Sequence, residues 1–192
     1  MAHPRIQHAL ISGTLEKHIA EVKGKKYAHL VMQKSKQVYR YLVKSAPKLS
    51  DDNPFSDFFL LCLCLIAPYQ ADDKKIDPQI LGDGMLDFLE KSINTFKRIN
   101  LKTKRGRAAF EKFAIEENQH KEKGYSFEYK IEEKAYTIII EKSPAQKALK
   151  KIGVMDLYPQ IIRVAEAIIK LQNGKLEHKL GEKGETIFTI SY

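Results

Sequence analysis

Ser143 and His178 are the two side chains whose types and positions best fit catalysis on a small molecule. Ser143 precedes Pro144, and a serine hydroxyl becomes a nucleophile only when a base lies beside it. The sequence assigns no such base. A Ser-Pro pair is typical of a helix start, with serine as the N-cap and proline as the first helical residue. We therefore expect Ser143 to cap a helix, with a nucleophilic role as the alternative.

His178 alternates with Leu176 and Leu180 near the end of the chain. A period of two is typical of a strand with one buried face. On that face the imidazole could act as an acid, as a base or as a hydrogen-bond donor to an anion bound in a pocket. A partly buried structural histidine fits the same pattern. Tyr129, an apolar position of an earlier alternating segment, is a second candidate to line the pocket.

The densest basic segment runs from Lys97 to Arg107. Within it Arg105 and Arg107 flank Gly106 just before a predicted helix, whose N-terminus could help them to bind a phosphate or a carboxylate; a solvated loop is the competing interpretation. The net charge of +9 favours anionic partners. Because the other cations are interspersed with glutamates, we expect a small anionic molecule as ligand. A nucleic-acid or protein-interaction module is the less favoured alternative.

The sequence does not favour metal or cofactor chemistry. Cys62 and Cys64 lie in an apolar run and supply only two of the four ligands of a typical zinc site, so we expect a buried pair. Glu116, Glu117 and His120 form a Glu-x-x-His step, but a bundle site needs a second such set. Gly-rich phosphate loops, dinucleotide fingerprints and nucleophile elbows are missing from the sequence. We expect no metal and no cofactor.

Helices that would position these residues follow from apolar spacing in the first two thirds of the chain. Periodicity predicts helices over residues 5–22, 25–44, 56–67, 85–98 and 110–120. Pro68 to Gly84 is rich in Pro, Gly and Asp and is predicted to be a long loop, of the kind that forms a lid or binding loop. The apolar side of the second helix is predicted to contain Tyr27, Leu30, Val31, Val38, Tyr41 and Leu42.

The last seventy residues predict two hairpins separated by two helices. Alternation indicates strands over residues 125–131 and 135–141, and again over 175–180 and 185–191. We expect one α+β domain over residues 1–192. Its helical part, residues 1–122 with about five helices, would pack on a ββααββ part, residues 123–192, with a four-stranded antiparallel sheet.

Three segments of this C-terminal part carry a family resemblance: KGYSFEYKIEE, SPAQKALKKIGVMDLYP and NGKLEHKLGEKGETIFTISY. In this order they resemble the C-terminal half of the L-2-amino-thiazoline-4-carboxylic acid hydrolase-like family. The resemblance implies an α+β fold that acts on a small carboxylate-bearing heterocycle. His178 corresponds to a basic residue of the family. The family's cysteine and aspartate positions are occupied here by Ser143, Ile162, Ala165, Phe188 and Thr189.

The replaced residues favour a small-molecule-binding protein on a hydrolase-like scaffold that has lost its catalytic groups. An active hydrolase that uses His178 is the alternative. The sequence contains no recognisable signal peptide and no apolar run of membrane-spanning length. We therefore expect a cytoplasmic protein without a membrane partner. The oligomeric state does not follow from the sequence, and a homodimer is compatible with it.

Overall fold

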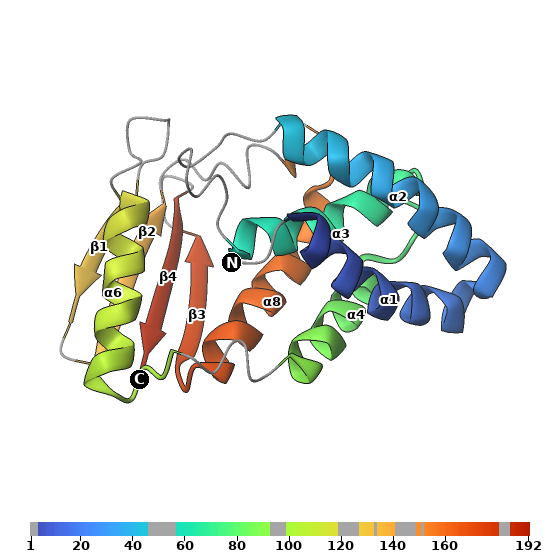
Figure 1. The fold of residues 1–192 in the computed structure, drawn as a ribbon. Coiled ribbons are helices and arrows are strands. Elements are labelled where there is room, and N and C mark those ends of the chain that lie inside the picture. Colours follow the sequence, from blue (N-terminus) through green and yellow to red (C-terminus); the bar gives the residue numbers. More distant parts are fainter. Residues whose placement is uncertain are drawn as a thin grey trace. The chain divides into compact units, whose positions relative to one another are not determined.

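The structure is a computed structural model that describes residues 4–45, 57–92, 99–118, 127–132, 134–140, 149–150, 152–180 and 185–192. Contacts within the chain divide it into two compact units, and Figure 1 labels the helices and strands. Unit 1 comprises Met1–Lys91 and Gly153–Val164, and unit 2 comprises Ser92–Ile152 and Ala165–Tyr192. The described residues form six α-helices and one four-stranded antiparallel sheet, which confirms the α+β class. The single-domain prediction stays a prediction.

Helices α1 (Pro4–Lys23) and α2 (Lys25–Ser45) of unit 1 were both predicted by the apolar spacing. Gly24 separates them with a φ of 87°, and its amide still donates to the carbonyl of Ala20 at 2.9 Å. A left-handed residue at this position ends the first helix. Glycine adopts this conformation without a steric penalty because it has no Cβ atom. The two helices pack directly against each other.

The predicted apolar side of α2 is wrong in part. Leu30 is 50% exposed and Tyr41 is 70% exposed. Successive helical residues rotate by about 100°, so both side chains lie on the opposite side of the helix from the stripe that packs inward. That buried stripe consists of Ala28, Val31, Met32, Ser35, Tyr39 and Leu42.

The predicted loop from Pro68 to Gly84 is also wrong. Helix α3 (Asp57–Ala71) continues through Pro68, and α4 (Pro78–Lys91) begins at the second proline, so only a short turn separates them. Asp77 Oδ1 accepts a hydrogen bond from the amide of Gln79 at 2.9 Å, which is an N-cap arrangement. The proposed lid therefore does not exist as a loop.

The glycines of that segment lie inside α4 because neighbouring groups approach them closely. A Cβ on Gly84 would lie 3.0 Å from Cδ2 and 3.3 Å from Cα of Leu15, in α1. A Cβ on Gly82 would overlap the side-chain amide of Gln160, in α8 (Tyr158–Leu171). These positions favour glycine for packing and not for a turn.

Unit 2 contains the sheet, α6 (Lys104–Asn118) and the end of α8. Strands β1 (Phe127–Ile131) and β2 (Ala135–Ile140) form the first hairpin. The second pairs β3 (Lys175–Leu180) with β4 (Thr186–Ser191), and the sheet order is β1-β2-β4-β3. Both predicted hairpins are thus confirmed, whereas most of the helix predicted after Pro144 lies outside the described residues.

One face of the sheet carries the core of unit 2, and α6 lies over the same sheet in Figure 1. Tyr136 and Ile190 are Cα partners on β2 and β4 and are both almost fully buried. Their neighbours come from α6, α8 and the segment before α6. This core consists of Leu101, Phe110, Tyr136, Ile169 and Ile190.

Candidate binding pocket

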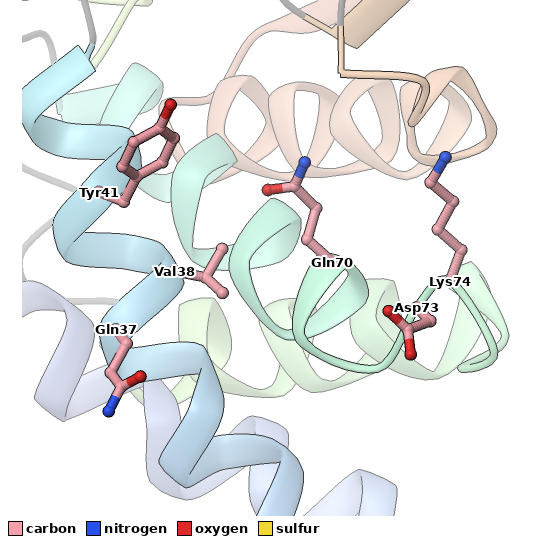
Figure 2. Close-up of a pocket in the computed structure, with 6 residues that line it drawn as sticks. All are labelled: Gln37, Val38, Tyr41, Gln70, Asp73 and Lys74. Carbon is pink, nitrogen blue, oxygen red and sulfur yellow. The ribbon is translucent and has the colours of Figure 1, made fainter.

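An open cavity of about 650 Å³ on the surface of unit 1 lies between α2 and the end of α3 (Figure 2). Its size falls within the range typical of small-ligand sites. The lining side chains come from the exposed edge of α2, the last turn of α3 and the turn after it. They are Gln37, Val38, Tyr41, Gln70, Asp73 and Lys74, and we call this cavity the α2–α3 pocket.

The turn that closes the α2–α3 pocket has an unusual backbone. Asp73 and Lys74 have φ values of 51° and 65°, in the left-handed region. Hydrogen bonds hold them there, because the Asp73 amide donates to the carbonyl of Gln70 at 3.1 Å and the Lys74 amide donates to that of Tyr69 at 2.9 Å. A left-handed non-glycine residue costs about 1 kcal/mol or more, and such residues cluster at ligand sites.

Two tyrosine hydroxyls anchor the elements around this turn. Tyr27 of α2 donates to the carboxylate of Asp72, and burial together with that carboxylate raises the pKa of Tyr27 to about 12. The buried Tyr69 donates to Asp156 Oδ2 at 3.2 Å. Burial, and next the Asp156 carboxylate, raise the pKa of Tyr69. Both phenols thus stay protonated as donors at neutral pH, and the turn is tied to two other parts of unit 1.

The polar groups of the α2–α3 pocket point in two directions. Figure 2 shows the polar ends of Tyr41, Gln70 and Lys74 on one side and those of Gln37 and Asp73 on the other. The Lys74 ammonium also lies close to Gly153, since a Cβ there would be 2.9 Å from Nζ. The side that carries Lys74 therefore presents one cation, one amide and one phenol, with the Asp73 carboxylate turned away.

The sequence-predicted pocket residues lie elsewhere, in unit 2. His178 faces Phe188 on β4, with ring centroids 5.4 Å apart. Phe188 is paired with Ile138, and Ile138 with Tyr129. His178 and Tyr129 therefore lie at opposite ends of one row of paired residues across the sheet. Three strand spacings separate the two by about 14 Å, too far for one small molecule to contact both directly. The Tyr129 side chain lies outside the described residues, and both roles stay predictions.

At the predicted anion site at the start of α6, Arg107 and the helix N-terminus already have partners within unit 2. Arg107 Nη1 donates to the carbonyl of Leu101 at 3.1 Å, and the guanidinium lies 5.1 Å from the ring centre of Tyr192. Thr103 Oγ1 accepts the amide of Gly106 at 3.0 Å, which caps the helix N-terminus.

The two arginines of this predicted site are also separated by the helix itself. Arg105 is exposed, and residues two apart on a helix point to different faces, so α6 does not bring Arg105 and Arg107 together. Ser143, the other predicted catalytic residue, lies outside the described residues. A ligand-binding role for the arginines and a catalytic role for Ser143 stay predictions.

Sequence reasoning missed a buried polar cluster around His8 in unit 1. Its Nδ1 lies 3.1 Å from Ser12 Oγ and its Nε2 lies 3.4 Å from Ser35 Oγ. Burial, and then the charges of Lys36 and Arg40, lower the pKa of His8 to about 4. A histidine beside a serine hydroxyl is the pairing of a nucleophile and its base, but Ser35 is completely buried. We therefore interpret the cluster as structural.

Helical spacing contains the signal that could have located His8. The histidine is three residues before Ile11 and seven before Leu15, both buried in α1. It thus belongs to the stripe of α1 that packs inward. The same inward packing brings its ring against Tyr39 of α2, with centroids 4.4 Å apart.

The predicted burial of Cys62 and Cys64 is confirmed. Burial raises the pKa of the Cys62 thiol to about 12 and also raises that of Cys64. Neither thiol is thus activated as a nucleophile or metal ligand at neutral pH. In the part of the chain that the structure describes, no group of three or more His, Cys, Asp or Glu is placed to hold a metal ion. The side chains of the Glu-x-x-His step lie outside that part.

None of the described helices is long and apolar enough to cross a bilayer. A scan against protein-family models found no match, and a search of curated proteins found none either.

Among solved structures, the chain is similar to two Fe(II) unliganded H-NOX proteins from K. algicida. The mutant form is 14% identical, with a TM-score of 0.30, and the alignment covers 95% of this chain and 94% of that one. The protein without the mutation is 13% identical with a TM-score of 0.31, and 94% of each chain is covered. TM-scores this low support no argument about fold or function.

Proposed function

We propose that this protein binds a small anionic molecule, carrying a carboxylate or a phosphate, in the α2–α3 pocket. One observation carries the proposal: Lys74 is held in a left-handed backbone conformation, with its polar end on the same side as those of Gln70 and Tyr41 (Figure 2). An ammonium supplies three hydrogen-bond donors and a full charge, and an amide and a phenol add neutral donors. This set matches the acceptors of a carboxylate or a phosphate.

The surroundings of the α2–α3 pocket favour the same ligand class. The exposed side of α2 is strongly basic, and a field of one sign raises the local concentration of ions of the opposite sign. Val38 gives the pocket an apolar wall on which the non-ionic part of the ligand can rest. We therefore expect an organic anion to bind more tightly than inorganic phosphate.

Calorimetric titration with phosphate and with succinate tests the proposal. Replacing Lys74 with Met removes the cation, and hydrogen bonds to charged groups are each worth about 1.5 to 3 kcal/mol, so binding should weaken by about tenfold or more. Lys75→Met is the matched control, because Lys75 is the exposed neighbour and does not line the pocket. Equal affinities for the two variants, or no binding by the unaltered protein, would contradict the proposal.

The hydrolase-like scaffold and its activity stay predictions that rest on sequence resemblance. Incubation with L-2-amino-thiazoline-4-carboxylate distinguishes hydrolysis from simple binding. This compound is a small carboxylate, so either kind of site could bind it, but only a hydrolase would turn it over. Binding without turnover is the result that our proposal expects. Turnover that disappears in His178→Ala while Lys74→Met remains active would instead support the hydrolase and locate it in unit 2.

A further inference from the structure

Helix α2 exposes a continuous basic face. Its sequence contains six cationic residues and no acidic one, although the whole chain has a net charge of only +9. All six side chains are exposed, and among the described residues none of them forms an ion pair. They are Lys25, Lys26, Lys34, Lys36, Arg40 and Lys44.

Three of these cations form a line. Lys36, Arg40 and Lys44 follow each other at intervals of four residues, which places them on one side of the helix about 6 Å apart along its axis. The acidic group that the described residues bring to α2 by an ion pair is Glu16, whose Oε1 lies 3.1 Å from Nδ1 of His29. That pair lies more than one helical turn from Lys36, so no ion pair among the described residues neutralises the line of cations.

An exposed aromatic ring lies beside this line. Tyr41 lies three residues before Lys44, so the two side chains are neighbours on the helix surface. Tyr41 is 70% exposed and forms the edge of the α2–α3 pocket. The apolar stripe of α2 is buried within unit 1. The large apolar side chains that α2 exposes, Leu30 and Tyr41, lie about three helical turns apart, so they do not form the continuous apolar face that an interfacial helix inserts into a membrane. Cations in a row with an adjacent exposed ring match the way in which proteins hold single strands, by phosphate contacts and base stacking.

We propose that the α2 face formed by Lys36, Arg40, Lys44 and Tyr41 binds single-stranded nucleic acid. The three cations contact successive phosphates and the Tyr41 ring stacks on a base. A single strand can follow a straight helix and turn a base out, whereas the bases of a duplex are already stacked on each other. This inference goes beyond the proposed function, because the three cations do not line the α2–α3 pocket and only Tyr41 belongs to both sites.

Fluorescence anisotropy with an oligothymidylate of about 20 nucleotides, longer than one stretch of contacts, tests this inference. For single strands the logarithm of the binding constant should fall linearly with that of the salt concentration, with a slope of about −0.7 per phosphate neutralised. The K36Q/R40Q/K44Q variant should therefore lose about 10- to 100-fold in affinity at 50 mM salt and have a slope shallower by about 2.

The matched control removes three cations from the start of α6. K102Q/K104Q/R105Q changes the net charge by the same amount at exposed positions, and its affinity should stay within about threefold of the unaltered protein. Tyr41→Ala should weaken binding by about tenfold through lost stacking, while Tyr41→Phe should not. Circular dichroism verifies that all variants are folded.

Several results would overturn the inference. They are no binding of the oligothymidylate at low salt, equal losses for the two triple variants, and an unchanged affinity in Tyr41→Ala. Tighter binding to a DNA duplex of the same length, to polyglutamate or to phosphatidylserine vesicles than to the oligothymidylate would also overturn the inference. Each of these results would show that another polyanion fits this face better.

Discussion

The exposed face of α2 and the start of α6 are both rich in Lys and Arg, yet their charges are arranged differently. On α2 the cations recur every four residues and line up on one side of a long helix. At the start of α6 they are crowded in sequence, but Arg107 is engaged by the Leu101 carbonyl and the Tyr192 ring. The cations of α2 therefore share one exposed line, whereas at the start of α6 an arginine is used for packing within unit 2.

The prediction with the largest expected effect concerns close packing at the start of α6, tested by a substitution at Gly106. A Cβ on Gly106 would lie 1.9 Å from the carbonyl oxygen of Asn100, so Gly106→Ala must displace backbone. We expect a loss of about 2 to 3 kcal/mol in the free energy of unfolding, which lowers the Tm by roughly 4 to 12 °C.

Gly13→Ala is the control for this substitution. Gly13 lies inside α1 with nothing within 4 Å of an added Cβ, so alanine should stabilise the helix by about 1 kcal/mol. Thermal unfolding followed by circular dichroism compares the two variants. If Gly106→Ala were as stable as the unaltered protein, the tight turn before α6 would be wrong.

The next prediction concerns the influence of two α2 cations on the protonation of His8 inside unit 1. The pKa of His8 is lowered to about 4 from an ordinary value of 6.5, by burial and then by Lys36 and Arg40. Between these values the unfolded chain binds more protons than the folded one, so stability is complete above about pH 6.5 and is lost as the pH falls toward 4. The expected loss attributable to His8 between pH 7 and pH 5 is about 2 kcal/mol.

Urea unfolding at the two pH values isolates this contribution. His8→Gln keeps a polar side chain at the site and should abolish the His8 part of the pH dependence. K36Q/R40Q should reduce it, because both positive charges that lower the pKa of His8 are removed. An identical pH dependence in all three proteins would contradict the environment described for His8.

A smaller effect compares one arginine from each region. Arg107→Gln removes the hydrogen bond to Leu101 and the contact with the Tyr192 ring, so we expect it to cost about 1 to 2 kcal/mol. Arg40→Gln changes an exposed side chain and should alter stability by less than about 0.5 kcal/mol. Equal costs in urea unfolding would remove the structural distinction between the two basic regions.

Much of the fold could be predicted because its signals are local. Gly24 and the apolar spacing around it predicted α1 and α2, and alternation predicted both hairpins. The first two turns of α4 were missed, because its helix was predicted to begin at Met85 although Asp77-Pro78 is a typical helix start. Gly82 and Gly84 suggested a loop, whereas their small size serves the contacts with Gln160 and Leu15. Such contacts depend on tertiary packing, which spacing along the sequence does not reveal.

The candidate pocket could not be predicted for a similar reason. It exists where α2 meets the turn after α3, and that turn was assigned to the predicted loop. Tyr41 was assigned to the buried side of its helix, although 70% of its surface is exposed, more than for any other large hydrophobic side chain in the described part of the chain. The predicted ligand class depended on net charge and needed no geometry, so an anionic ligand remains the proposal while its expected site has moved from His178 to Lys74.

The central claim is that small anions bind beside α2 in unit 1 and not at the residues singled out in unit 2. Backbone amide chemical-shift mapping by NMR during a titration with succinate at low salt tests it most directly. Our account predicts saturable shifts at residues 37–41 and 70–74, with little change at 100–107 and 176–188. Shifts confined to those last two segments, or none at any succinate concentration, would contradict it.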